Sequence, residues 1–178
     1  MPDLVITLIG PDRPGIVESV AQPIAAHGGN WLESRMAHLA GKFAGILRIE
    51  VPADRTEALV QALRRLEERN LRVVAEVSPP EERPAGEQLV DLDLVGTDRP
   101  GIVREISRLL AEQGVNIEEL TTDRTTAPMS GELLFRAAAR VRIPKDVDRA
   151  ALRARLERLA SDLVVEVKLA EIFATKPR

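Results

Sequence analysis

One nine-residue stretch occurs twice in this chain, and the two copies lie 86 positions apart. The first copy, I-G-P-D-R-P-G-I-V, runs from Ile9 to Val17, and the second, V-G-T-D-R-P-G-I-V, runs from Val95 to Val103. Seven of the nine positions are identical, and the same offset carries the Gly-x-Asn that ends at Asn30 onto the one that ends at Asn116. A long-period repeat of this kind predicts two copies of one structural unit.

Each copy of the motif follows an apolar run and precedes an amphipathic one, which predicts a strand, a tight loop and the start of a helix. The remainder of each copy completes the order β-α-β-β-α-β. Two such copies predict two ferredoxin-like domains of the α+β class in tandem, each with an antiparallel sheet and helices on one face. We expect strands at 4–9, 31–39, 43–51 and 71–77, then at 89–95, 115–123, 133–143 and 163–172, with a turn-rich loop at 124–131.

The junction between the copies, from Ser78 to Gly86, contains three prolines and a Glu-Glu-Arg run. This composition is typical of a semi-extended, exposed linker. We therefore place the first domain at residues 1–78, the linker at 79–86 and the second domain at 87–178.

The composition favours a globular protein and argues against direct recognition of nucleic acids. Hydrophobic residues make up 44% of the chain and charged residues 30%, which is typical of a folded domain. The net charge is −3, and only four aromatic side chains are available for stacking on bases. We therefore expect no direct binding to DNA or RNA.

The absence of cysteine excludes disulfides and fits a cytoplasmic protein. The apolar run from Leu4 to Ile9 is too short for the core of a signal peptide or for a membrane span. The sequence therefore predicts a cytoplasmic protein that is not associated with a membrane.

The sequence offers little for catalysis or metal binding. The only histidines, His27 and His38, have no evident serine or cysteine nucleophile beside them. Asp91, Asp93 and Asp98 form an acidic group, but no histidine joins it. We expect no catalytic site, no metal and no cofactor.

The repeated loop is the strongest candidate for a binding site. Its proline suits the first turn of a helix, and its aspartate can cap the exposed amides there. Its glycine leaves the backbone bare, and a helix N-terminus with free amides suits an anion such as a carboxylate. The candidate residues are Asp12, Arg13, Pro14, Gly15 and Ile16 in the first copy and Asp98, Arg99, Pro100, Gly101 and Ile102 in the second.

The same residues also admit purely structural roles, and the sequence leaves these open. A Gly-Pro turn between a strand and a helix needs these residue types even without a ligand. Arg13 and Arg99 can pair with a carboxylate ligand or remain solvated loop charges. Asn30 and Asn116 can bond a ligand or stabilise a turn.

The D-R-P-G-I-V loop, the later G-x-N and the β-β-α-β remainder resemble ACT domains, which are small regulatory modules that bind amino acids. Two such domains with nothing attached resemble the glycine cleavage system transcriptional repressor family, over nearly the whole chain. The resemblance implies a ligand between the first loop of one domain and the second strand of a neighbour, with Asn30 and Asn116 as contacts. Because G-V-N-I in the second copy fits the family pattern better than G-G-N-W in the first, we expect the ligand near Gly101.

The resemblance implies an amino-acid-responsive regulator that senses glycine or serine and acts through contact with a partner protein, not as an enzyme. One alternative is a stand-alone regulatory subunit or remnant of an enzyme, similar to the domains that precede the catalytic parts of formyltetrahydrofolate deformylase and phosphoserine phosphatase. Another is a ligand-free assembly scaffold. Sheet edges that need pairing, and a weakly charged outer face around Val5 and Thr7, predict contacts between domains and a homodimer as one expected assembly.

Overall fold

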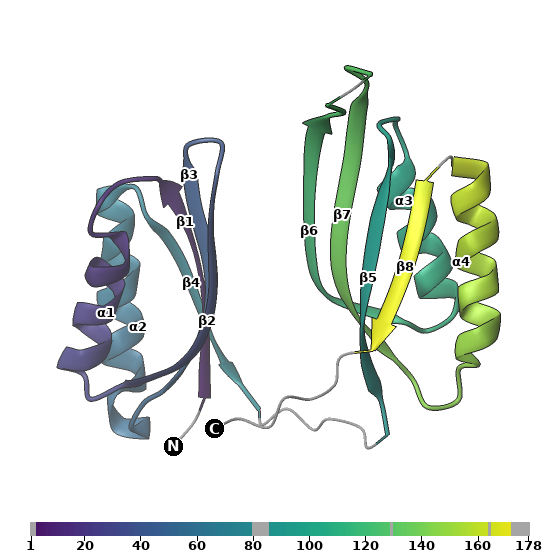
Figure 1. The fold of residues 1–178 in the computed structure, drawn as a ribbon. Helices are drawn as coiled ribbons and strands as arrows, with labels where there is room; N and C mark the ends of the chain where they lie inside the picture. The colour runs from purple at the N-terminus through teal and green to yellow at the C-terminus, as the bar shows by residue number, and fades with distance from the viewer. Residues whose placement is uncertain (1–2, 80–85, 129, 164, 172–178) are drawn as a thin grey trace. The chain divides into compact units, whose positions relative to one another are not determined.

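The computed structural model describes residues 3–79, 86–128, 130–163 and 165–171. The chain divides into two compact units, Met1–Arg83 and Pro84–Arg178. Each unit is an antiparallel four-stranded sheet with two helices on one face (Figure 1). The predicted pair of ferredoxin-like β-α-β-β-α-β domains is therefore confirmed. The predicted linker at 79–86 lies outside the described residues except for its first and last positions.

The first domain has the sheet order β2-β3-β1-β4, so that β1 is central and β2 and β4 are edge strands. Alternating apolar residues of β1, among them Leu4, Ile6 and Leu8, are buried beneath α1 and α2. The elements are β1 (Asp3–Pro11), α1 (Ile16–Ala26), β2 (Asn30–Leu39), β3 (Lys42–Glu50), a 3-10 turn (Ala53–Arg55), α2 (Thr56–Arg64), a second 3-10 turn (Arg65–Arg69) and β4 (Arg72–Ser78).

The second domain repeats this arrangement with the order β6-β7-β5-β8. Val90, Leu92 and Leu94 of β5 are buried, whereas Asp91 and Asp93 lie on the opposite face, as the alternation predicts. The elements are β5 (Gln88–Thr97), α3 (Ile102–Glu112), β6 (Asn116–Thr126), β7 (Leu133–Ile143), α4 (Arg149–Leu163) and β8 (Val165–Glu171).

Two boundaries in the second domain differ from the prediction. β6 continues to Thr126 instead of giving way to a loop at 124, because its β-branched threonines pair with β7. α4 continues to Leu163, the residue expected to open the last strand, because that side chain is buried with the rest of the helix stripe. The final strand therefore starts at Val165.

The buried hydrophobic residues form two clusters, one in each domain. In each domain the helices bury one face of the sheet and leave the other face open (Figure 1). Among the described helices, none has both the length and the apolar composition that crossing a membrane requires.

Candidate functional site

In both copies of the motif, a glycine in the left-handed conformation precedes the helix. Gly15 has a φ of 86° and Gly101 a φ of 95°, angles that are strained for any residue with a Cβ. The carbonyl of each glycine accepts the first helical hydrogen bond, at 2.9 Å from the Ser19 N–H and at 3.0 Å from the Glu105 N–H. The glycine is therefore the N-cap residue, and its conformation sets the direction of the helix.

The predicted roles of the motif proline and aspartate at the helix start are wrong. Pro14 and Pro100 lie in the turn before the helix, not in its first turn. No side chain caps either helix, because Asp12 and Asp98 lie three residues before the N-cap position, outside the reach of a capping side chain. The first-turn amides, which have no acceptor within the helix, are left for an acceptor from outside.

Each loop aspartate pairs instead with the second strand of its own domain. Asp98 Oδ2 lies 2.7 Å from Arg124 Nε, and Asp12 Oδ2 lies 3.7 Å from His38 Nε2. His38 and Arg124 were not among the residues predicted to contact the loop, although the 86-residue offset aligns them with each other. A contact between the loop aspartate and this position of the second strand is therefore common to both copies. It holds the loop against the edge strand of the sheet.

The loop arginines bond to the ends of helical segments. Arg13 Nη2 donates to the carbonyl of Arg69 at 3.2 Å, and Arg99 Nη2 donates to the carbonyl of Asp162 at 3.0 Å. Both carbonyls lie at the C-terminal end of the domain's second helical segment, where a cation is favoured. Each arginine thus ties the loop to that segment, which is a structural role common to both domains.

Asn30 and Asn116 lie at the opposite end of the sheet from the loop of their own domain. Asn30 is the first residue of β2. It is in register with Glu50 of β3, which is in turn in register with Asp3 at the start of β1. The loop, in contrast, follows Pro11 at the end of β1. At about 3.3 Å per residue, the two ends of β1 are separated by roughly 25 Å. Because the second domain has the same topology, neither asparagine can share a site with the loop of its own domain.

Asn116 belongs to a polar cluster at the start of β6. Its Nδ2 donates to Glu118 Oε1 at 2.6 Å, and Arg142 donates to Glu118 at 3.0 Å and to Glu87 at 3.2 Å. The hydrogen bond to Glu118 raises the pKa of the Arg142 guanidinium above its usual value, although burial opposes the rise. Arg142 therefore remains a cation that fixes Glu118 and, through it, the amide of Asn116.

The surroundings of the two loops differ in charge. α1 carries Glu18 at the position where α3 carries Arg104. The Oε2 atom of Glu18 lies 3.9 Å from the place that a Cβ would take on Gly15. Among the described residues, no atom beyond the chain neighbours lies within 4 Å of the same place on Gly101. The second loop is therefore the more open and the less acidic of the two.

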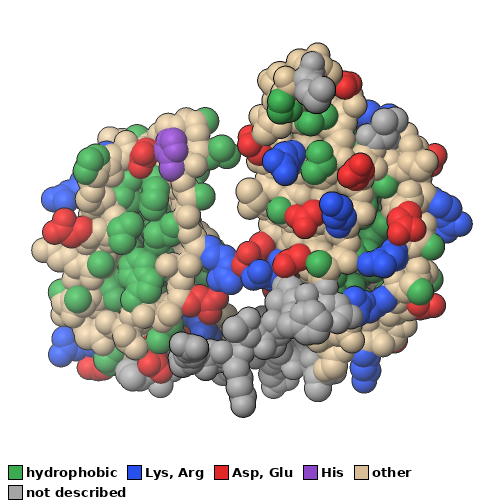
Figure 2. All heavy atoms as spheres, viewed as in Figure 1, with side chains coloured by type: hydrophobic (Ala, Val, Ile, Leu, Met, Phe, Trp, Pro, Cys, Tyr) green, Lys and Arg blue, Asp and Glu red, His purple; other side chains and the backbone are tan. Residues whose placement is uncertain are grey.

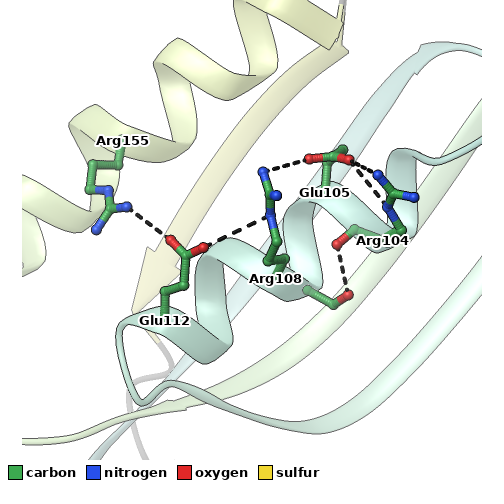
Figure 3. Close-up of polar contacts among 6 residues, drawn as sticks. Arg104, Glu105, Arg108, Glu112 and Arg155 are labelled. Atoms are coloured by element: carbon green, nitrogen blue, oxygen red, sulfur yellow. Dashed lines mark hydrogen bonds and ion pairs between the residues drawn. The ribbon is translucent and has the colours of Figure 1, made fainter.

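Arg104 is the first member of a series of ion pairs along α3 (Figure 3). Glu105 pairs with Arg104 at 2.9 Å and with Arg108 at 3.0 Å. Glu112 lies 3.9 Å from Arg108 and 3.2 Å from Arg155 of α4. The series links α3 to α4 and holds a cation beside the start of α3. In the described part of the chain, α1 and α2 have no comparable series.

A small apolar gap lies between α3 and the sheet of the second domain, beside Val103, Leu120 and Phe135. Its volume of about 30 Å³ is that of a single water, so it is a gap in the packing rather than a ligand pocket. Within the described ranges, no group of acidic or histidine side chains is arranged to hold a metal ion.

Two sequence-family models match the chain, one over residues 2–75 and the other over residues 90–160, and both describe the ACT domain. The chain belongs to the ACT-domain family, with two domains in tandem. ACT domains are regulatory modules, so the fold is a regulatory one, and the resemblance drawn from the D-R-P-G-I-V loops is confirmed.

Two solved structures match the chain over nearly the full length of both chains. A protein of unknown function from Galdieria sulphuraria is 28% identical, with a TM-score of 0.83 over 96% of this chain and 98% of its own. A proposed glycine cleavage system transcriptional repressor is 22% identical, with a TM-score of 0.71 over 96% of this chain and 97% of its own. At that identity, the second structure shows a common fold only.

A third structure, a formyltetrahydrofolate deformylase from Pseudomonas putida KT2440, matches much less well. It is 24% identical and aligns over 47% of this chain and 29% of its own, with a TM-score of 0.40, which is too low to support a functional argument. No curated protein is significantly similar to the chain in sequence. The two ACT-domain matches in tandem and the match over nearly the whole chain to the Galdieria structure favour a regulatory protein over part of such an enzyme.

Proposed function

We propose that this tandem ACT-domain protein is an amino-acid-responsive regulator that binds glycine or serine at the loop of its second domain. The observation that carries the proposal is the uncapped start of α3, where Gly101 leaves open space beside the first amides. The carboxylate of a free amino acid would accept hydrogen bonds from the amides near Arg99 to Ile102. The helix dipole favours a negative charge at this position.

Two features favour the second domain over the first. In the first turn of α3 the positive charge of Arg104 offsets the carboxylate of Glu105, whereas Glu18 leaves the first turn of α1 with a net negative charge. An incoming carboxylate would therefore be repelled less at the second loop than at the first. The bare glycine and the exposed loop suit a ligand with a small side chain or none.

The rest of the ligand needs partners that the same domain does not supply. Because Asn116 lies at the far end of its own sheet, the asparagine that completes the site would come from the second strand of another ACT domain. Either Asn30 or Asn116 of such a neighbour can offer an amide to the ligand. A ligand held in this way would strengthen contact between domains.

We infer that the protein acts through a partner protein and that this regulator works in the cytoplasm. The net charge of −3 gives little basis for direct contact with DNA. Neither loop brings together an acid, a base and a nucleophile, so a regulatory role fits the chemistry better than catalysis.

Thermal denaturation of the full chain in the presence of each common amino acid tests the proposal. Glycine or serine should stabilise the protein by about 2.7 kcal/mol at a hundredfold excess over its dissociation constant. Asn116→Ala should cost about 1–3 kcal/mol of binding if this asparagine contacts the ligand, with folding unchanged.

Charge-reversal variants test which of the two loops binds the ligand. Arg104→Glu should weaken binding by about fivefold, the upper range for an exposed charge. The matched reversal Glu18→Arg in the first domain should leave that affinity unchanged. Stability that does not respond to any amino acid would overturn the proposal.

A further inference from the structure

A recess lies on the second domain where the start of α4 meets the end of β8. Its volume of about 370 Å³ is within the range of sites that bind small molecules. Its lining is aliphatic apart from two arginines of α4, and among the described residues no acidic side chain lines it. The lining residues are Ile143, Arg149, Ala150, Leu152, Arg153 and Leu169.

The floor of the recess is the edge of the hydrophobic core of this domain. Ile143 and Leu152 are buried members of that core, and Leu169 of β8 is partly buried and packs against it. An aliphatic group placed in the recess would contact these side chains and would itself leave water, which is favourable. The recess therefore suits a ligand with a short hydrocarbon part.

Two guanidinium groups, one helical turn apart on α4, lie at the recess. Arg153 Nη2 donates to the carbonyl of Leu169 at 3.0 Å, and Arg149 Nη1 donates to Gln88 Oε1 at 3.1 Å. A guanidinium has five N–H donors, so the bond that orients Arg153 leaves others for a ligand. Within the described part of the chain, Arg153 forms no ion pair. Lysine and arginine side chains lie over the end of β8 and the start of α4 (Figure 2).

The backbone amides at the start of α4 already have an acceptor, unlike those of α3. Asp148 Oδ1 accepts the N–H of Ala150 at 2.9 Å and that of Ala151 at 3.3 Å. This side chain caps the helix and occupies the position that an anion would otherwise take. An anion in the recess would therefore be bound by the arginine side chains and not by the helix start.

The two arginines are particular to the second copy of the repeat. When the first buried leucine of α2 is aligned with that of α4, Thr56 takes the position of Arg149, and Val60 takes that of Arg153. Val60 packs against the core of the first domain. The fold is thus completed by an aliphatic side chain at this position, and it does not require a cation there.

We propose that this recess binds a small aliphatic carboxylate that carries no ammonium group. Arg153 would hold the carboxylate, Arg149 would add positive charge from the neighbouring turn, and the hydrocarbon part would lie against Leu169. A free amino acid fits poorly, because its ammonium group would lie beside two cations without an acidic partner. The recess is thus a second site, which differs from the loop site in position and in ligand class.

A matched pair of ligands tests the ligand class on the full chain. 4-Methylpentanoate has the carbon skeleton of leucine but lacks its amino group. Its titration should produce saturable changes in the backbone amide chemical shifts of Ala150 to Arg153 and of Leu169, and leucine should bind at least about tenfold more weakly. The absence of saturable changes at these amides would overturn the site. Equal binding of leucine, or of inorganic phosphate, would overturn the ligand class.

Substitutions on α4 test the role of Arg153. Arg153→Gln should weaken binding of 4-methylpentanoate by about tenfold or more, and Arg153→Lys should weaken it less, since lysine keeps the charge but not the paired donors. The matched control is Arg155→Gln on the same helix, whose guanidinium pairs with Glu112 of α3. It should leave the affinity unchanged. Unchanged binding in Arg153→Gln, or an equal loss in both glutamine variants, would overturn the proposal.

Discussion

The two ACT domains begin their first helices in the same way but surround them with different charges. Both helices follow a left-handed glycine, yet the first turn carries Glu18 alone in one domain and Arg104 together with Glu105 in the other. The loop aspartate is held by His38 in the first domain and by Arg124 in the second. The backbone conformation has few alternatives, because only glycine adopts it without strain. The charges have many alternatives, so they are free to differ between the two copies.

The open faces of the two sheets differ in the same manner. Equivalent register positions hold Thr7, Ile46 and Val74 in the first domain and Asp93, Ala138 and Lys168 in the second. The strands are alike because the helix-facing residues form equivalent cores, whereas the open-face residues are free to change. One repeat unit has thus produced one open face with aliphatic side chains at these positions and another with charged ones.

The largest expected effect concerns whether the two cores are independent. Leu59→Ala in the first core and Leu152→Ala in the second should each cost about 2–5 kcal/mol, since both side chains are fully buried. The only tryptophan, Trp31, packs against the first core and reports on that domain alone. In urea, Leu59→Ala should lower the fluorescence midpoint, and Leu152→Ala should leave it in place. An equal shift in both variants would mean that the domains unfold as one unit.

An intermediate effect is expected at the glycine that both loops share. Gly101→Ala and Gly15→Ala should each cost about 1–2 kcal/mol, the cost of a left-handed conformation for a residue with a Cβ. At Gly101 the cost would come from strain alone, because the Cβ position is open. A larger side chain at Gly101 would therefore test folding as well as binding. Urea denaturation would measure the cost, and a loss below about 0.3 kcal/mol would contradict the assigned conformation.

The smallest expected effect concerns the contacts of the two loop aspartates, which should differ in strength between the domains. The Asp98–Arg124 pair is short, at 2.7 Å, with Asp98 half-buried and Arg124 exposed, whereas the Asp12–His38 pair is long, at 3.7 Å, with both side chains exposed. Arg124→Ala should cost about 0.5–1 kcal/mol and His38→Ala less than about 0.5 kcal/mol, the range of exposed ion pairs. Double-mutant cycles with Asp98→Asn and Asp12→Asn would isolate each pair. A larger coupling energy for Asp12–His38 than for Asp98–Arg124 would contradict this order of strength.

The repeat and the periodicity of the apolar residues predicted the fold, because both depend on local order along the chain. The partners of the loop side chains depend on tertiary structure. Asp12 can cap a helix or pair across to a strand, and only the position of the left-handed Gly15 decides between them. Arg13 bonds to a carbonyl 56 residues away, a contact that no local pattern encodes.

The placement of the asparagines was within reach of the sequence. A helix that follows β1 runs back along the sheet, so the next strand must start at the opposite end from the loop. The β-α-β order therefore already separates Asn30 from Gly15. The charge difference between Glu18 and Arg104 was also visible, but its meaning depended on knowing where the helices start.

Backbone amide chemical shifts during a titration with glycine, and separately with serine, test the central claim most directly. Because the ligand carboxylate is proposed to bind the uncapped start of α3, the amides from Gly101 to Glu105 should move and saturate, while those from Gly15 to Ser19 should stay in place. Arg104→Glu should weaken this response, and Glu18→Arg should not. Saturable shifts confined to the first loop or to another surface, or no saturable shift with either amino acid, would contradict the account.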